Sequence, residues 1–514
     1  MPLSLVGSEM CIRDSTNIAP SWLSENSFSL TSSFISDDFF GMMDGSEGSM
    51  ATADKLDIAV GRILAESPQR ANEMVDKIES YYNADAYANW RNNFLLISDD
   101  VDKLSDRFLQ LTTDEIAEDV KTSKPFINVK KIHSDSFTQE SSAAGQRYPQ
   151  VNDAIFDALE VGAVVVNYFG HGGEDGLASE RIFDKINAKE LNNPSKLACF
   201  VTVTCEYTKF DNPLRETAGE FLYWNKRGGA IGLITTTRQI FISVGIQFNE
   251  TLSQYLFDFE NSQTMSIAEA LRLTRNDPSV TNNAQRRLVF FIGDPALKLP
   301  LAAPEIIATK LNGEDITNTN ITLQALSPAK IEGFVASEQG NIINNYSGTL
   351  TATVFDKSIQ RTTLANDGST FNGQLITLDY ETLGEVLFRG QATVENGKFE
   401  INFIVPRDIV VPVGNGKISF YSKTDNPLSD QRGYNFDIKI GGVNLNAPED
   451  NQGPNIELYM NDESFVSGGI TNENPTLIAK LFDENGINTA SGVGHDIVAL
   501  LDGDETNPFI LNDY

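Results

Sequence analysis

Three predominantly apolar runs constrain the fold of this chain more than any other feature. They are Ala163–Phe169, Leu197–Cys205 and Gly229–Thr235. Each run has the length of a strand, and segments with helical spacing, such as Ala154–Leu159 and Val244–Phe259, lie between them. Strands that lack polar alternation are buried on both faces, as in a parallel sheet covered by helices. The sequence therefore predicts an α/β domain with helices on both sides of the sheet.

Further elements of the same kind extend this domain from about residue 56 to residue 300. Leu56–Ile63, Asn93–Ser98 and Arg287–Ile292 are predicted strands. Ser67 is a predicted cap for a helix over Pro68–Tyr82, because Ser is a favoured N-cap and Pro suits the first helical position.

The pattern changes after Pro300. Between Thr309 and Ile440 short runs rich in Thr, Ile and Val alternate with Gly, Asn and Asp, as in Thr349–Phe355 and Lys398–Val405. Period-two alternation broken by turn residues is typical of a β-sandwich, so an immunoglobulin-like sandwich is predicted here. A polar linker at Asn446–Gly453 leads into a second β-rich segment.

The predicted domain division follows from these changes. Residues 16–300 form the α/β domain, residues 301–445 the β-sandwich, and residues 446–514 the start of a second, truncated β-module. Residues 1–15 lack both the basic region and the apolar region of a signal peptide, so they are interpreted as a non-native leader. We expect the chain to be a fragment of a longer protein. The amino-terminal part of its α/β domain is expected to be incomplete.

The charge of the chain restricts its partners. The formal net charge is -32 over 514 residues. Such acidity argues against binding nucleic acid or anionic lipid through a basic face. It is typical of a protein outside the cytoplasm or in a saline habitat, and the charge alone does not separate these.

The cysteines point to chemistry rather than cross-linking. Apart from Cys11 in the leader, the chain has only Cys199 and Cys205. Six residues of strand separate them by about 20 Å, which is too far for a disulfide. Cys199 lies inside the strand and is predicted to be core. Cys205 follows the strand end, where a thiol is either buried or used.

His171 and Cys205 are the strongest candidates for catalysis. Each follows a predicted strand of the parallel sheet, and one crossover makes these strands neighbours. An imidazole beside a thiol is the arrangement that nucleophilic thiol catalysis needs. The amides of Gly172 and Cys205 are candidates for an oxyanion hole. Alternatively, His171 is a turn residue among glycines and Cys205 a small buried hydrophobe.

Four other residues are candidates for the substrate cleft. Asp99 and Asp100 end a predicted strand and suit a specificity pocket, a calcium ion or a helix cap, of which a cap or turn is favoured. Glu206 adjoins the nucleophile and either tunes the thiolate or is solvated. Thr236 follows the next strand and is predicted to wall the cleft.

The remaining candidates carry weaker signals. His133 is predicted at the surface because its surroundings are rich in Lys and Ser, and His495 is predicted to be structural. The acidic run Asp502–Glu505 suits calcium but lacks EF-hand spacing. No cofactor is predicted beyond a possible structural calcium, and no third catalytic group is evident.

Five segments resemble the gingipain-type cysteine peptidases. They are SDDFFGMMDG (Ser36–Gly45), IAVGRI (Ile58–Ile63), NYFGHGGEDGL (Asn167–Leu177), VTVTCEYTKFDNP (Val201–Pro213) and FIGDPALKLP (Phe291–Pro300). The resemblance covers most of residues 36–300. It implies a caspase-like fold in which His171 is the general base and Cys205 the nucleophile. Gingipains select Arg or Lys through an acidic pocket residue, and the resemblance does not assign that residue to a position in this sequence.

Two segments after residue 300 show which members of this family the chain resembles most. Asn341–Lys357 and Gly453–Asp504 are similar to β-modules of the sortases of the type IX secretion system. The similarity implies a cell-surface peptidase that removes the carboxy-terminal sorting domain of secreted cargo. It also implies an anionic lipopolysaccharide as acceptor, an outer-membrane shuttle β-barrel as partner, and an export signal absent from this fragment.

Two other functions remain open at this point. A surface adhesin would have lost activity and would use its β-modules to hold a partner. A broad secreted protease would digest many proteins without needing a sorting domain. The presence of both His171 and Cys205 favours an enzyme over the adhesin, and the two β-modules favour the sortase over the broad protease.

Overall fold

The structure is a computed structural model. It describes residues 21–24, 29, 33–143, 145–212, 214–259, 264–280, 283–317, 321–407, 409–449, 452–473, 475–483, 487–488, 497–504 and 509–511. The predicted leader, residues 1–15, lies outside this range.

The chain forms two compact units. The first contains residues up to 304 together with two later segments, residues 359–382 and 425–432. The second contains residues 305–358, 383–424 and the rest of the chain from 433.

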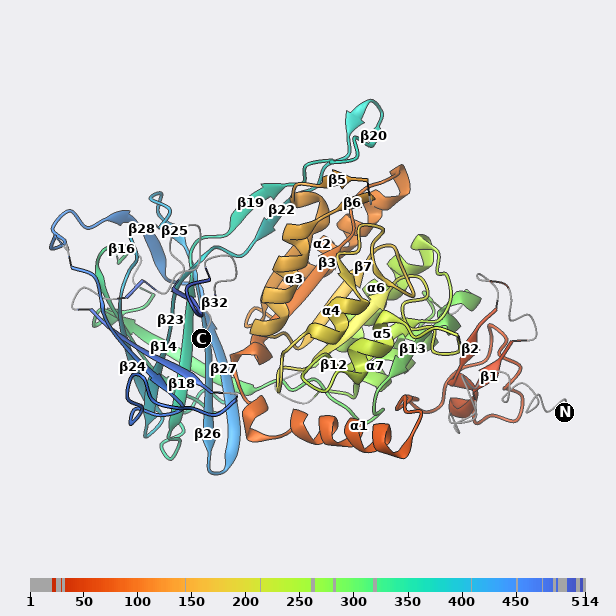
Figure 1. Cartoon of the computed structure of the whole chain (residues 1–514), viewed down its shortest axis with the longest axis horizontal. Coiled ribbons are helices and arrows are strands. Elements are labelled where there is room, and N and C mark those ends of the chain that lie inside the picture. The colour runs from red at the N-terminus through yellow and green to blue at the C-terminus, as the bar shows by residue number, and fades with distance from the viewer. Residues whose placement is uncertain are drawn as a thin grey trace. The chain divides into compact units, whose positions relative to one another are not determined.

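A six-stranded sheet forms the centre of the first unit, in the order β13-β12-β11-β7-β3-β4 (Figure 1). The strands are β3 (Asn93–Ser98), β4 (Asn128–His133), β7 (Val165–Phe169), β11 (Ala198–Val203), β12 (Ala230–Thr236) and β13 (Val289–Ile292). All neighbours are parallel except β12 and β13, which are antiparallel. The predicted α/β domain with a parallel sheet is therefore confirmed.

Helices cover both faces of this sheet. They are α1 (Pro68–Tyr81), α2 (Arg107–Ser123), α3 (Pro149–Val161), α4 (Lys185–Glu190), α5 (Ala218–Trp224), α6 (Ile242–Leu256) and α7 (Ile267–Asn276). In β3, Phe94 and Leu96 pack in the core that contains α2, α6 and α7, whereas Leu95 and Ile97 pack in the core that contains α3, α4 and α5. Successive side chains enter opposite cores, which is why four consecutive positions of the strand, Phe94–Ile97, are apolar.

Local signals fix the helix starts as the sequence predicts. The Ser67 side chain accepts a hydrogen bond from the Arg70 amide, and Pro68 occupies the first turn of α1. Ser266 caps α7 in the same way through the Glu269 amide. Both side chains satisfy amide groups that the first helical turn leaves without a partner.

The predicted strand at Leu56–Ile63 is wrong. Within this segment only Arg62 forms a β-bridge, to Ile292. The guanidinium of Arg62 pairs with Asp37 at 2.6 Å, and Arg272 donates to the Leu56 carbonyl at 2.9 Å. Isolated backbone hydrogen bonds, such as that from the Arg62 amide to the Phe291 carbonyl at 3.0 Å, and these side-chain contacts hold the segment in place of a strand ladder. Its alternating apolar residues are equally compatible with such an extended, packed segment.

The predicted β-sandwich is also wrong, because the sheet closes into a barrel. Its seven strands run in the order β14-β17-β24-β23-β18-β26-β27, and β27 pairs with β14. They are β14 (Ala303–Leu311), β17 (Pro328–Val335), β18 (Gly348–Phe355), β23 (Val386–Glu395), β24 (Lys398–Ile404), β26 (Lys417–Asp425) and β27 (Leu428–Asn435). Sandwiches and barrels share the same alternation along each strand, so only the closing pair distinguishes them.

Smaller elements complete the chain. Two short strands, β19 (Ile359–Thr362) and β22 (Asp379–Thr382), form a hairpin whose residues belong to the first unit. Farther on, β29 (Asn455–Met460) pairs with β30 (Leu477–Phe482). Across the described residues, the structure contains no helix with the length and apolar character required to cross a membrane.

Candidate active site

His171 and Cys205 lie at the same edge of the central sheet. Strands β7 and β11 are parallel neighbours, and Phe169 is paired with Val203 at their carboxyl ends. Each candidate residue stands two positions beyond its strand's last pair. The structure therefore confirms that the two strands are neighbours. It places both residues at the same level above the sheet, where sites form in folds of this kind.

A close backbone approach brings the two loops together. A Cβ atom added to Gly172 would lie 2.7 Å from Oγ1 and 3.0 Å from Cγ2 of Thr204. Gly172 follows His171 directly, and Thr204 precedes Cys205. Because only glycine fits at this distance, the side chain that Gly172 lacks is what allows the histidine and cysteine loops to touch.

The His171 loop is held by a carboxylate and a hydroxyl. The amide of His171 donates to Oδ2 of Asp99 at 2.7 Å, and the Tyr168 hydroxyl donates to the His171 carbonyl at 2.5 Å. The Ala178 amide donates to the same carbonyl at 2.9 Å. These bonds fix the backbone of His171. Its side chain is 32% exposed, so the ring still faces solvent.

Asp106 provides the group that orients the imidazole. Its Oδ1 lies 3.4 Å from Nε2 of His171, a separation typical of an ion pair with a protonated ring. Asp106 itself is fully buried and accepts hydrogen bonds from the Lys103 amide at 3.2 Å and the Ser105 hydroxyl at 3.0 Å. With Nε2 facing Asp106, Nδ1 is the nitrogen left for proton exchange.

Sequence reasoning missed Asp106 as a site residue. Its only signal is a concentration of aspartates after β3, at Asp99, Asp100, Asp102 and Asp106. Sequence spacing does not decide which of the four turns back toward a loop 65 residues later. In the folded structure Asp106 contacts the His171 ring, and Asp99 accepts a hydrogen bond from the His171 amide.

The electrostatics of His171 favour its charged form. The contact with Asp106 raises the pKa of the imidazole above its ordinary 6.5, burial opposes this, and Asp99 adds to it. Burial alone would raise the pKa of Asp106. The contact with His171 opposes burial, and the pKa of Asp106 is lowered overall. Each charge stabilises the other, as expected for an ion pair in a partly desolvated site.

The thiol of Cys205 is in its neutral form when no base acts on it. Burial raises its pKa above the ordinary 9.0, a contact with the Ile240 carbonyl at 3.8 Å opposes this, and Glu206 raises it further. Cys205 is half-buried, whereas Cys199 is fully buried within β11 and its pKa is raised to about 12. Of the two described thiols, only Cys205 is accessible.

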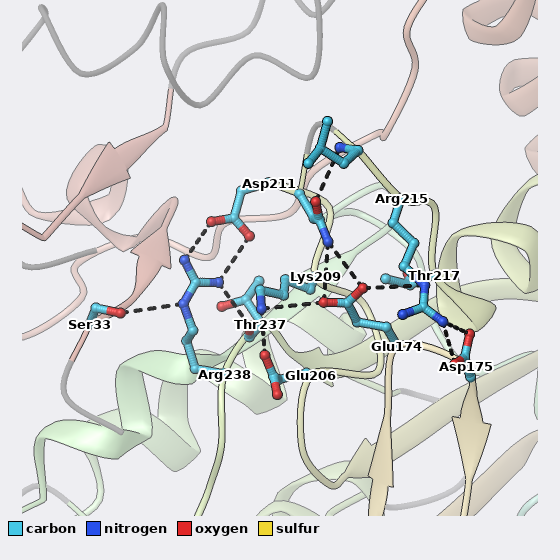
Figure 2. A network of polar contacts seen from close by, with 12 residues as sticks. Ser33, Glu174, Asp175, Glu206, Lys209, Asp211, Arg215, Thr217, Thr237 and Arg238 are labelled. Carbon is cyan, nitrogen blue, oxygen red and sulfur yellow. Dashed lines mark hydrogen bonds and ion pairs between the residues drawn. The ribbon is translucent and has the colours of Figure 1, made fainter. Parts of the chain in front are cut away.

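Figure 2 shows a network of charges next to the two loops. Lys209 lies between two carboxylates, 2.6 Å from Glu206 and 3.3 Å from Glu174. Glu206 follows the nucleophile candidate and adopts a positive φ of 53°, which is uncommon for a residue other than glycine. Glu174 lies three residues after His171. Lys209 therefore links the histidine loop to the cysteine loop.

The same network reaches the loop after β12. The amide of Glu206 donates to the Arg238 carbonyl at 3.2 Å, and the Arg238 guanidinium pairs with Asp211 at 2.5 Å (Figure 2). Arg215 pairs with Asp175 at the exposed end of the network. Three consecutive strand ends are thus cross-linked by charges around Cys205.

The structure places the other cleft candidates as follows. Thr236 is fully buried, and its hydroxyl donates to the Thr204 carbonyl, so it braces the strand end before Cys205. Asp100 accepts a hydrogen bond from the Tyr148 hydroxyl at 2.7 Å. Burial and the neighbouring Asp99 raise the pKa of Asp100 to about 9.

Two overlapping groups of carboxylates can supply metal ligands near His171. Asp99, Asp100 and Glu180 form one group, and Asp100, Asp102 and Asp367 form the other, with ligand atoms within 4.8 Å of one another in each. Carboxylate oxygens are the ligands that hard cations such as calcium prefer. These residues are the described ones near the site that would hold such an ion.

The prediction for His133 is wrong. Its side chain is fully buried at the end of β4, where Nδ1 lies 2.8 Å from the Ser98 hydroxyl and the ring packs against Tyr380. The Lys and Ser residues around His133 in the sequence suggested a surface position. At the end of β4, however, the His133 side chain points into the protein interior. His495 lies outside the described residues, as does Glu505, whereas Asp502 lies in an exposed turn.

The comparison with protein families decides what kind of protein this is. The profile of peptidase family C25 matches residues 2–300, which is more than half of the chain. The chain belongs to peptidase family C25. This C25 protein is therefore a cysteine peptidase.

Solved structures similar to this C25 peptidase include two bacterial proteins. The Arg-specific cysteine proteinase gingipain R is 16% identical, with 78% of this chain and 79% of that chain covered at a TM-score of 0.42. Dimeric latent PorU from Porphyromonas gingivalis is 19% identical, with 96% of this chain but 40% of that chain covered at a TM-score of 0.33. No curated protein sequence matches the chain.

Proposed function

We propose that this C25 peptidase cleaves proteins through His171 as general base and Cys205 as nucleophile, with Asp106 orienting the imidazole. One observation carries this proposal. The two residues stand at equal register beyond adjacent parallel strands, and the loops that hold them touch at Gly172 and Thr204. A thiol, a base and a third group that orients the base are the signature of covalent thiol catalysis.

The reaction follows from these positions. Nδ1 of His171 takes the proton of the Cys205 thiol, and Sγ attacks the carbonyl carbon of the scissile peptide bond. The tetrahedral intermediate collapses as His171 returns the proton to the departing amine, which leaves a thioester on Cys205. Water or another amine then attacks the thioester, and its proton passes to His171 as Sγ leaves.

The amides of Gly172 and Cys205 are proposed to bind the developing oxyanion. The Ala178 amide bonds to the His171 carbonyl, and Gly172 is paired with Leu177 at the next position of the same antiparallel ladder. Hydrogen-bonded and non-bonded pairs alternate in such a ladder, so the Gly172 amide points away from its partner strand. An amide free in this way is a donor for the oxyanion.

We further propose that the cargo is a secreted protein with a carboxy-terminal sorting domain. The support is the similarity of Asn341–Lys357 and Gly453–Asp504 to modules of type IX secretion sortases. The proposal includes a location at the cell surface, an outer-membrane shuttle β-barrel as partner and an anionic lipopolysaccharide as acceptor. In chemical terms, an acceptor amine replaces water in resolving the thioester.

The test uses the full chain and a cargo protein that carries its sorting domain, with an amine acceptor present. Cleavage and the mass of the new end are followed by mass spectrometry for the parent and for Cys205→Ala. Cys199→Ala is the matched control, because it removes the other described thiol and should cost stability but no chemistry.

Each outcome has a definite meaning. Cleavage by the parent and Cys199→Ala alone, with the acceptor joined to the new end, supports a thioester-forming sortase. Cleavage with only water added supports a peptidase and contradicts transfer. Equal degradation of cargo without a sorting domain favours a broad protease. Equal activity of Cys205→Ala and the parent would overturn the mechanism.

A further inference from the structure

A long hairpin from the barrel sequence belongs to the first compact unit. Residues 359–382, here called the arm, lie in the chain between β18 and β23 of the barrel. At the base of the arm β19 pairs with β22, and farther along β20 (Thr370–Phe371) pairs with β21 (Gln374–Leu375) (Figure 1). Its partners are residues of the peptidase unit more than 200 positions earlier in the chain.

Asp135 anchors the arm. Its carboxylate accepts hydrogen bonds from the Ala365 amide at 3.0 Å, the Asn366 amide at 2.8 Å and the Asn366 side chain at 2.9 Å. The Leu364 amide donates to the Asp135 carbonyl at 2.7 Å. Asp135 is 1% exposed, so the bonds are shielded from water. Several amides converging on one buried carboxylate form a specific docking point rather than a chance surface contact.

The tip of the arm, Leu364–Phe371, touches the loop that carries Asp106. The Ser369 hydroxyl donates to the Asp102 carbonyl at 2.9 Å. The Arg107 guanidinium carbon lies 4.6 Å from the Phe371 ring and 4.5 Å from the Phe108 ring. These contacts fall on both sides of Asp106 in the chain, so the tip holds the loop before and after the residue that faces His171.

Glutamine side chains fix the tip from a third direction. Nε2 of Gln139 lies 3.3 Å from both Asp100 and Asp367, and Nε2 of Gln146 lies 2.8 Å from Asp367. Gln139 therefore bridges the tip to the loop after β3. The carboxylates of Asp100, Asp102 and Asp367 come close together here, so neutral donors must offset their repulsion.

We infer that the arm is a latch which positions Asp106, and through it His171, so that undocking the arm tip slows the peptidase. The inference rests on the proposed function of His171 and Cys205. Asp135 and Ser369 are positioning residues, because they act only through the loop Asp99–Arg107. Since both ends of the arm continue into barrel strands, a partner that displaces the arm would reduce the rate of cleavage without touching the dyad.

The test replaces residues 363–378 by Asn-Gly in the full chain. Thr362 and Asp379 are directly paired, so a two-residue turn closes the hairpin and leaves its base intact. Gln374→Ala, an exposed position in the removed segment, is the matched control. Three experiments are made: steady-state kinetics give kcat and KM for cargo cleavage, a pH series gives the profile of kcat/KM, and NMR gives the pKa of His171, assigned with His171→Gln.

The latch predicts a specific pattern. Removing the tip lowers kcat about 10- to 100-fold, the scale of a catalytic group misplaced by about 1 Å, with little change in KM. The pKa of His171 falls, and the acid limb of the pH profile moves to lower pH, as in Asp106→Asn. Tip removal has little further effect in an Asp106→Asn background, because both changes remove the same interaction.

Other outcomes overturn the latch. An unchanged kcat and an unchanged pKa of His171 would show that the arm only braces the fold, even if the melting temperature falls. Full additivity with Asp106→Asn would also contradict it. If the parent shows no Cys205-dependent cleavage, the proposed function fails, whereas the NMR titration of His171 still tests whether the arm controls this side chain.

Discussion

Two histidines of the peptidase unit occupy similar places and differ in almost every physical property. His133 ends β4, and His171 follows β7 by two residues, so both lie at the carboxyl edge of the sheet. Each has an aspartate near Nε2, Asp114 at 3.8 Å for His133 and Asp106 at 3.4 Å for His171. His133 is fully buried, whereas 32% of the His171 side chain is exposed.

Their titration follows this difference. Burial lowers the pKa of His133, and the opposing effect of Asp114 is too weak to reverse it. For His171 the contact with Asp106 outweighs burial and raises the pKa. A histidine with an aspartate beside it is therefore not yet a catalytic base. It also needs access to solvent and a nucleophile within reach, and His171 alone of the two has Cys205 on the neighbouring strand.

The largest effect should come from removing the exposed imidazole. We expect His171→Ala to lower kcat about 10²- to 10⁴-fold, because general base catalysis contributes on that scale. The unfolding free energy should also fall at low pH, because the contact with Asp106 adds stability there. Cleavage assays and urea denaturation of the same samples measure both quantities. A variant that keeps its activity would remove His171 from the mechanism.

The next effect tests the orienting carboxylate. Asp106→Asn should lower kcat about 10- to 100-fold through loss of ring orientation. It should also shift the acid limb of kcat/KM to lower pH, because Asp106 raises the pKa of His171 and the reaction needs the neutral ring. The pH profile of both proteins measures this. A shift to higher pH would contradict the assigned contact.

The buried histidine should affect stability and not chemistry. We expect His133→Ala to lower the unfolding free energy by about 1–3 kcal/mol, because it leaves a cavity and removes the partner of the Ser98 hydroxyl. Denaturant titration measures this loss, and kcat per folded molecule should match the parent. A specific loss of kcat without a loss of stability would reverse the roles assigned to the two residues.

The two histidines should give opposite pH dependence of stability. The pKa of His133 is lowered on folding, so its native environment costs stability as pH falls below the unfolded value near 6.5. The pKa of His171 is raised, so it adds stability at low pH that is lost as pH rises through the folded value. We therefore expect His133→Gln to be least destabilising at pH 5 and His171→Gln to be most destabilising there.

Denaturation of both variants at several pH values tests this prediction. Parallel curves for the two variants between pH 5 and pH 8 would mean that burial, rather than the aspartate, dominates at both sites.

The smallest effect concerns the charges beside Cys205. Glu206 raises the pKa of the thiol, and Lys209 pairs with Glu206 at 2.6 Å. Glu206→Gln should speed alkylation of Cys205 at neutral pH about twofold to fivefold, and Lys209→Met should slow it by a similar factor. The double variant should resemble Glu206→Gln. Iodoacetamide kinetics in a Cys199→Ala background measure this, and a double variant that resembles Lys209→Met would contradict it.

Much of the fold was accessible from sequence because buried parallel strands have a local signature. Ala163–Phe169 and Leu197–Cys205 are predominantly apolar without polar alternation, and this pattern is typical of strands covered on both faces. Their order along the chain and the right-handed crossover made them neighbours. The prediction of His171 and Cys205 at one sheet edge followed from that, and the structure places them there.

Other features were not accessible because they depend on contacts between distant residues. Asp106 faces His171 across 65 positions, and the arm tip reaches Asp102 across 267 positions. Barrel closure depends on the pairing of β14 with β27, which alternation along each strand does not encode. The placement of His133 failed for a related reason, since its polar neighbours in sequence are not its neighbours in space.

The sequence by itself determined the α/β class, the pairing of the two strands beside the site, and the position of His171 and Cys205 at one edge of the sheet. Local sequence patterns suffice to predict these features, because the burial of a strand and its end can be inferred from consecutive residues. Only the tertiary structure decided which aspartate faces the His171 ring and which distant segment contacts the Asp106 loop. Those choices depend on distances and desolvation among side chains that the fold alone brings together.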